Sequence, residues 1–283
     1  MLIRLGYELV YRLAQPTPMI LNLNVHYSRT ADLVAPDRIV TDPPVAASAY
    51  RDGTGNWCTR LVATAGRFRI GSDALIRDSG LAEPAYGNAY EHPVEALPDD
   101  TLVYLLASRY CETEVLAPIA WQLFGSGPRG WARVQAICDY VHDHIEFDYQ
   151  AARPTKTAWE AHREQRGVCR DYAHLAISLC RALNIPARYC TGYLGDIGIP
   201  PVCAPMDFAG WFEAYLGGAW HTFDPRNNQR RIGRVLIARG RDAVDVAMVM
   251  TFGPNVLESF RVWTDQVANE VENGSDSGSA VIF

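Results

Sequence analysis

The sequence predicts an α+β protein in which an antiparallel β-sandwich precedes a domain of helices and a second antiparallel sheet. Three observations support this prediction. Apolar and polar residues alternate through much of residues 1–90, as in strands with one buried face. Helical spacing dominates from about residue 99 to residue 183, and hairpin patterns return after it. This separation of helices from strands favours α+β over a doubly wound parallel sheet.

The expected N-terminal domain, residues 1–90, contains several strands. Alternation from Ile3 to Tyr11 predicts the first strand, and residues 21–27 predict a second whose polar face carries His26, so we expect this histidine to face solvent. Turn residues 52–56 separate two β-rich runs, which predicts a hairpin. The two runs are residues 45–50 and 57–63, and a further strand is expected over residues 67–75.

The helical region begins after a polar, proline-containing linker at residues 86–98. Asp99 and Asp100 stand where an N-cap is favoured, so we expect an amphipathic helix from there to about Tyr110. Further helices are expected from their apolar spacing, over residues 115–124, 131–144 and 157–161.

A helix over residues 168–183 is expected to lie at the centre of this domain, because its apolar residues go nearly all the way round. Gly167 precedes it, and Pro186 ends it. Cys169 then lies at the helix N-terminus, where the dipole stabilises a thiolate. Two interpretations of Cys169 stay open, a nucleophile and a small buried hydrophobe. Cys180 fits the second.

The remaining chain predicts strands and a tail. A strand at 188–194 and a hairpin of 211–216 with 220–224 follow the central helix, and more β-type sequence and an amphipathic stretch complete the domain at 235–238, 244–251 and 256–267. We therefore expect a core domain at 91–268. Residues 269–283 are polar and lack periodicity, so they are expected to form a C-terminal tail.

Composition excludes several classes of function. The net charge is −6 and no Lys/Arg cluster stands out, which argues against nucleic-acid binding. The N-terminus alternates and carries charge, unlike a signal peptide, and no apolar run reaches the length of a membrane span. Seven cysteines is an odd number without disulfide or zinc spacing, which indicates free thiols. We therefore expect a cytoplasmic protein with no membrane association.

No cofactor or metal is expected. A site built from Cys169, His174 and His221 lacks the standard ligand spacing. His142 and His144 are two residues apart, so on a helix they point to different faces. The sequence also shows no acidic loop of the calcium-binding pattern.

Four segments in order resemble the transglutaminase-like superfamily, which shares a papain-type catalytic core and includes transglutaminases, peptidases and amidases. They cover roughly residues 155 to 226, and the β-rich front is similar to the domain that precedes this core in bacterial members. The segments are Gly167-Val168-Cys169-Arg170-Asp171-Tyr172-Ala173, then residues 185–193, which end in Gly192-Tyr193, then Trp211-Phe212-Glu213-Ala214-Tyr215-Leu216, then Trp220-His221-Thr222-Phe223-Asp224-Pro225.

The resemblance implies a papain-like (cysteine proteinase-type) core with a Cys-His-Asp triad for acyl transfer. Cys169 would be the nucleophile, and Asp224 would orient the imidazole. The family histidine precedes the strand tryptophan by two residues, but here that position is Ala209. A general acid and base contributes about 10²–10⁴-fold. The departure therefore bears directly on activity.

Three hypotheses follow. The preferred hypothesis is an impaired enzyme, or pseudoenzyme, whose cleft binds a peptide or protein. The alternative is an active cysteine protease, amidase or transglutaminase that forms a Cys169 thioester with His221 as base. His221 lies three residues before Asp224, so on a regular strand the two point to opposite faces, and a bulge is needed to bring them together. A purely structural β-domain module is the third. The sequence indicates neither the substrate nor the oligomeric state.

Overall fold

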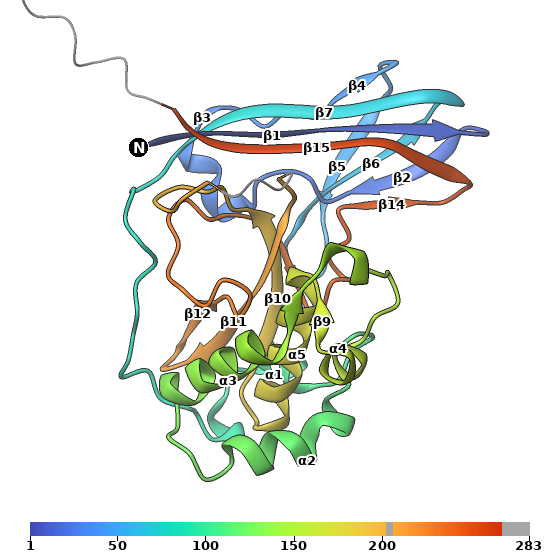
Figure 1. The fold of residues 1–283 in the computed structure, drawn as a ribbon. Coiled ribbons are helices and arrows are strands. Elements are labelled where there is room, and N and C mark those ends of the chain that lie inside the picture. The colour runs from blue at the N-terminus through green and yellow to red at the C-terminus, as the bar shows by residue number, and fades with distance from the viewer. Residues whose placement is uncertain (202–205, 268–283) are drawn as a thin grey trace, which may run out of the picture.

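The computed structural model describes residues 1–201 and 206–267 and has the expected α+β arrangement. Two antiparallel sheets lie at one end of the molecule, and a core of helices around a third antiparallel sheet lies at the other (Figure 1). The fold class predicted from the sequence is confirmed.

The first N-terminal sheet is built on β1 (Leu2–Leu13), the alternating segment at the start of the chain. It pairs on one side with β15 (Asn255–Val267) and on the other with β7 (Gly66–Arg77). β3 (Leu33–Ala35) and β4 (Val40–Asp42) also pair with β7. The inward residues of β1, such as Ile3, Leu5 and Tyr7, are buried, as the alternation predicts.

The second N-terminal sheet has the order β14-β2-β6-β5. β5 (Ala47–Arg51) and β6 (Trp57–Ala63) form the hairpin expected around the turn at 52–56. β2 (Thr17–Leu21) pairs with β6, and β14 (Val249–Thr251) pairs with β2.

The prediction of a strand at residues 21–27 is wrong. Only Leu21 belongs to a strand there, and a 3₁₀ helix begins at Tyr27. His26 is buried rather than exposed to solvent, and its Nδ1 accepts from the backbone N–H of Ser28 at 3.3 Å. Local capping of the 3₁₀ helix therefore overrides the alternating pattern.

The amphipathic stretch at 256–267 is the strand β15, which pairs with β1 along its whole length. β14 likewise pairs with β2. The expected core segment 91–268 therefore ends in two strands that pair within the N-terminal sheets. The predicted tail at 269–283 lies outside the described residues.

The core is organised around α5 (Cys169–Ala182) and an antiparallel sheet of order β12-β11-β10-β13. α5 packs on β11 and β10, and three helices pack around α5. The sheet contains β10 (Ala187–Tyr193), β11 (Ala209–Leu216), β12 (Ala219–Phe223) and β13 (Val235–Gly240), and the three helices are α2 (Thr113–Phe124), α3 (Trp131–His144) and α4 (Ala158–Glu164).

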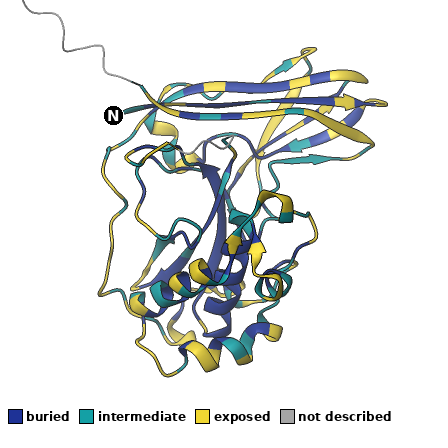
Figure 2. Ribbon diagram, in the orientation of Figure 1, coloured by how far each residue is buried: buried dark blue, intermediate teal, exposed yellow. Residues whose placement is uncertain are grey.

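The central position of α5 is visible in its burial (Figure 2). Every residue from Asp171 to Ala182 is buried, as the all-round apolar pattern predicts. The amphipathic helix expected from Asp99 to Tyr110 is shorter, because α1 spans only Asp99–Leu102. β8 (Glu146–Phe147) and β9 (Arg166–Gly167) form a parallel pair before α5, and 3₁₀ helices span Tyr27–Asp32, Val94–Ala96, Val103–Leu105 and Tyr149–Ala151.

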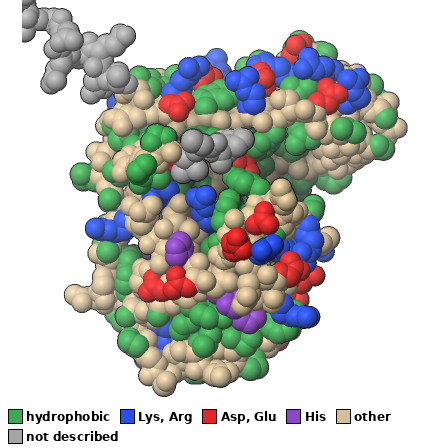
Figure 3. Space-filling view, viewed as in Figure 1, with side chains coloured by type: hydrophobic (Ala, Val, Ile, Leu, Met, Phe, Trp, Pro, Cys, Tyr) green, Lys and Arg blue, Asp and Glu red, His purple; other side chains and the backbone are tan. Residues whose placement is uncertain are grey.

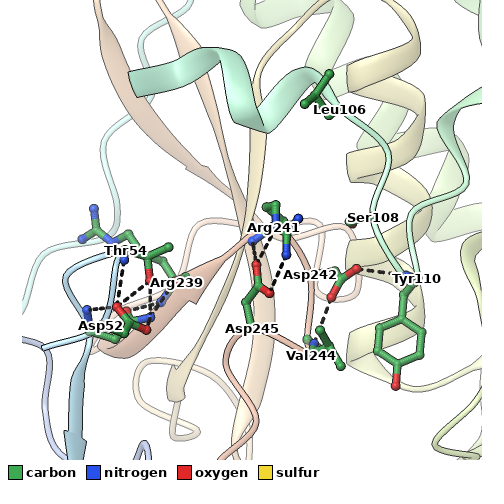
Figure 4. A network of polar contacts seen from close by, with 12 residues as sticks. Asp52, Thr54, Leu106, Ser108, Tyr110, Arg239, Arg241, Asp242, Val244 and Asp245 are labelled. Carbon is green, nitrogen blue, oxygen red and sulfur yellow. Dashed lines mark hydrogen bonds and ion pairs between the residues drawn. The ribbon is translucent and has the colours of Figure 1, made fainter. Parts of the chain in front are cut away.

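Polar contacts connect the N-terminal sheets to the core (Figure 4). Asn56, in the turn of the β5–β6 hairpin, donates to the carbonyl of Arg239 at 2.8 Å and accepts from its N–H at 2.9 Å. Asp242 accepts from the N–H groups of Tyr110 and Val244, both at 2.9 Å. The buried side chains of Asn56 and Asp242 therefore both have hydrogen-bond partners, and these bonds fix the end of β13 on both sides.

Candidate functional site

Cys169 is the first residue of α5, at the helix N-terminus expected from the sequence. The turn into the helix is held by Asp171, whose carboxylate accepts from the N–H of Val168 at 3.0 Å. A Cβ on Gly167 would overlap the side chain of Asp171. Glycine is therefore required before Cys169 because the capping carboxylate approaches the backbone closely.

A cleft of about 870 Å³ contains Cys169. Its walls come from the start of α5, from β10 and β11, and from the β15 side of the N-terminal sheets. The ring of Phe208 on the core side lies 5.9 Å from the ring of Phe260 on β15. The other apolar residues that line the cleft are Phe147, Tyr149, Ala152, Pro154, Val168, Tyr189, Leu194, Met206, Ala209, Met248 and Leu257.

The position expected to carry a histidine lies beside the thiol. Ala209 lines the cleft, and the backbone N–H of Gly210 hydrogen-bonds the sulfur of Cys169. None of the described residues that line the cleft is a histidine. An imidazole at residue 209 would therefore be next to Cys169, but the chain has a methyl group there.

The environment of Cys169 favours the neutral thiol. Its pKa is raised to about 11, mainly by burial and also by the carboxylates of Asp207 and Asp224, while the Gly210 N–H and the Arg226 guanidinium lower it by less. At neutral pH the sulfur is therefore almost entirely protonated, although the residue is partly exposed in the cleft.

Asp224 lies in the same region as Cys169, since its charge acts on the thiol. Its carboxylate accepts from Arg234 at 2.8 Å and from the N–H and Nδ2 of Asn227 at 3.0 and 2.7 Å. Burial raises the pKa of Asp224, but Arg234 and Asn227 outweigh burial, so the pKa lies below its ordinary value. The carboxylate is thus ionised and fully hydrogen-bonded without any imidazole.

His221 lies elsewhere in the structure. Its Nε2 is 3.0 Å from the carbonyl oxygen of Leu216, and its ring lies among those of Tyr86 and Trp131, at 4.8 and 5.6 Å. It does not line the Cys169 cleft. Neither Asp224 nor His221 lines the cleft, but the charge of Asp224 acts on the Cys169 thiol, whereas His221 lies in a cluster of aromatic rings.

His174 is fully buried within α5. Its ring stacks on Tyr110 at 5.1 Å, and its Nε2 accepts from the N–H of Ala243 at 3.1 Å. Burial holds its pKa well below the ordinary value. The residue is a packing and hydrogen-bonding histidine. Within residues 1–201 and 206–267, no group of three His, Cys, Asp or Glu side chains is placed to hold a metal ion.

Two charged cleft residues were missed by the sequence analysis, Asp207 and Arg226. Neither forms an ion pair with another described residue. Burial raises the pKa of the Asp207 carboxyl even though part of the residue is exposed. Arg226 directly follows the Phe-Asp-Pro segment, but nothing in that pattern indicates that its side chain enters the cleft.

The sequence profile of the transglutaminase-like superfamily matches residues 122–225. Among solved structures, a candidate cysteine protease from Cytophaga hutchinsonii is 31% identical, with a TM-score of 0.81, over 96% of this chain and 92% of that one. This likeness extends over both the N-terminal sheets and the core. The chain belongs to the transglutaminase-like superfamily.

Curated relatives match over shorter segments. An uncharacterized protein of Mycobacterium leprae is 36% identical over 92 residues, which are 31% of this chain and 32% of that protein. The kyphoscoliosis peptidase of mouse is 31% identical over 101 residues, which are 32% of this chain and 15% of that protein. The matched segment thus spans about a third or less of the length of these relatives.

None of the described residues forms a helix long and apolar enough to cross a bilayer. The described cysteines, six in number, are all free.

Proposed function

We propose that this transglutaminase-like protein binds a peptide segment in the Cys169 cleft without the histidine-dependent acyl transfer of its superfamily. The observation that carries the proposal is the state of the thiol. Its pKa is raised to about 11, carboxylates are among the charges that act on it, and none of the described cleft residues is a histidine. A neutral thiol is a weak nucleophile, and no imidazole protonates the leaving amine.

The shape and chemistry of the cleft support a peptide ligand. A volume of about 870 Å³ lies within the range of small-ligand pockets. Apolar side chains such as Phe208, Leu257 and Phe260 line the cleft together with charged side chains such as Asp207 and Arg226. Peptides present this combination of apolar groups and polar backbone.

The experiment uses the full chain to select heptapeptides from an mRNA-displayed library. We expect enriched peptides that bind wild type and the Cys169→Ala variant within about twofold, because the sulfur makes no bond to the ligand. Phe260→Asp provides the control, since Phe260 is 40% exposed and lines the cleft. A selection that yields no peptide whose binding depends on Phe260 overturns the proposal.

Turnover is measured on the same peptides by mass spectrometry. We expect no hydrolysis or amine transfer that depends on Cys169. Turnover by wild type that disappears in Cys169→Ala overturns the proposal and supports the second candidate function below.

The second candidate is an active cysteine peptidase or amidase. It is favoured by the likeness to the candidate cysteine protease of Cytophaga hutchinsonii and by the retained Cys169 and Asp224. Asp207 then becomes the nearest source of a proton for the leaving amine, because its carboxyl has a raised pKa and lies in the cleft. This candidate requires turnover that is lost in both Cys169→Ala and Asp207→Asn but retained in His221→Ala.

A further inference from the structure

Arg226 differs from the other arginines of the cleft in having no carboxylate partner. Its guanidinium lies over the ring of Phe147, 4.4 Å from the ring centre, and its Nη1 donates to Oδ1 of Asn227 at 2.9 Å. Among the described residues, no Asp or Glu oxygen lies within ion-pair distance of it. The positive charge of Arg226 is therefore fixed in place but not neutralised.

The other three cleft arginines are paired with acids. The pairs are Arg153 with Glu164 at 2.7 Å, Arg170 with Asp171 at 3.4 Å and Arg231 with Asp196 at 3.7 Å. The charge available to a ligand is thus concentrated at Arg226.

Asp224 fixes the side chain of Asn227, which contacts both Arg226 and Arg231. Its carboxylate accepts two hydrogen bonds from Asn227, which fixes the side-chain amide with Oδ1 directed toward the arginines. That one oxygen accepts from both Arg226 and Arg231, each at 2.9 Å. The terminal nitrogens of the two guanidinium groups therefore lie within about 6 Å of each other.

Arg231 places a second guanidinium beside Arg226. It lines the cleft but is 3% exposed, and its Nε is enclosed by protein atoms. Its two terminal nitrogens donate to Asn227 and to the carbonyl of Gly195, so it adds positive charge rather than a donor that the ligand reaches. A planar carboxylate accepts from two donors of one guanidinium at once, which suits Arg226.

Resting on the proposed peptide binding, we infer that Arg226, with Arg231 beside it, forms a subsite for a carboxylate of the bound peptide. Asp224 acts as a positioning residue, through Asn227, for this subsite. In the superfamily pattern the same aspartate orients a histidine, and with Ala209 in the histidine's place its hydrogen bonds are directed to the arginine side instead.

The other unpaired charge of the cleft limits where the carboxylate lies. Asp207 acts on the Cys169 thiol with the opposite sign to Arg226. Both also act on Tyr149, again with opposite signs. A carboxylate near Asp207 would be repelled, so the subsite needs the ligand's acidic group to contact Arg226 rather than to lie beside Asp207.

Three synthetic versions of one cleft-selected peptide test the inference. The first has an internal Glu and an amidated C-terminus, the second has Gln and the amide, and the third has Gln and a free C-terminal carboxylate. Affinities are measured by calorimetry with wild type. We expect the Glu peptide or the free-carboxylate peptide to bind about tenfold more tightly than the neutral one, and the preferred version identifies which carboxylate occupies the subsite.

Arg226→Gln should reduce that preference to about onefold while affinity for the neutral peptide stays within about twofold. Arg226→Lys should restore part of the preference, because it keeps the charge. The matched control is Arg153→Gln, which removes another cleft arginine already paired with Glu164 and should leave the preference unchanged.

The outcomes separate this inference from the proposed function. Equal affinities of wild type for all three peptides overturn the carboxylate subsite and leave cleft binding intact. If Arg226→Gln weakens all three peptides by the same factor, Arg226 has only a structural role and the inference is overturned. A failed selection, in contrast, overturns the proposed function itself.

Discussion

Restoring the missing imidazole gives the most direct test of how the site works. Ala209→His places a histidine next to the sulfur of Cys169, because residue 209 lines the cleft and residue 210 hydrogen-bonds that sulfur. An imidazolium at this position pairs with the thiolate, and the carboxylates of Asp207 and Asp224 favour its positive charge.

The size of the effect follows from the charge environment. A cation within about 4–6 Å lowers the pKa of an acidic group by about 1 to 3. For Cys169 we take a drop of about 2, from about 11 to about 9. At pH 7.5 the thiolate fraction then rises about 100-fold, but each thiolate is about tenfold less nucleophilic because nucleophilicity falls with pKa. The net expected gain in reaction rate is about tenfold.

The assay is the rate of reaction with an uncharged aromatic disulfide at pH 7.5. Cys203 lies outside the described residues, so every variant carries Cys203→Ser. The rate of the Cys169→Ala variant is subtracted as background. Ala209→Gln is the matched control, since it adds a polar side chain without a titratable group and should react like wild type. Equal rates for Ala209→His and Ala209→Gln would refute the placement of residue 209 beside the thiol.

Three further predictions concern the same region. Asp224→Asn breaks a buried pair with Arg234 and should cost about 3–5 kcal/mol at pH 7 by urea unfolding. Because the folded pKa of Asp224 lies below its ordinary value of 3.8, its contribution is present above that value and disappears as the pH falls through the folded pKa, so the two proteins should converge in acid; a constant difference contradicts this. The rate at which wild-type Cys169 reacts with the disulfide should rise about tenfold per pH unit from pH 7 to 9.5, since the pKa is about 11. A plateau near pH 8 contradicts this prediction. Gly210→Ala places a Cβ against the Tyr189 hydroxyl and should destabilise by about 1–3 kcal/mol; in a Tyr189→Phe background the loss should shrink, and an unchanged loss argues against this contact.

The sequence predicted the core well because its signals are local. The all-round apolar pattern identified α5, and Gly167 and Pro186 marked its ends. The hairpin around Gly217 also follows from short-range turn chemistry. The placement of Cys169 at the helix N-terminus follows from the same pattern.

One strand was predicted wrongly for a local reason, and one strand that depends on a distant partner was not predicted. Alternation at residues 21–27 was overridden by the capping of a 3₁₀ helix through His26. Residues 256–267 were identified only as an amphipathic stretch, and the strand that they form pairs with β1 at the other end of the sequence. A strand of this kind is recognised only through the pairing partner.

The candidate site was predictable only in part. Cys169 and Asp224 stand in motifs, so their proximity could be expected. Arg226 and Asp207 stand in segments without regular structure, and their importance comes from the lack of an ion-pair partner among the described residues. That property depends on all the charges around them in space, and spacing along the chain does not encode it.

The return of the chain to β1 has a consequence for folding order. Because β15 completes a sheet whose other members precede the core, that sheet stays incomplete until the last described residues have left the ribosome. Leu257 and Phe260 of β15 also line the cleft, so a chain shortened before Asn255 should retain a folded helical core yet lose one side of its binding surface. Ligand binding would then appear only after β15 has been synthesised.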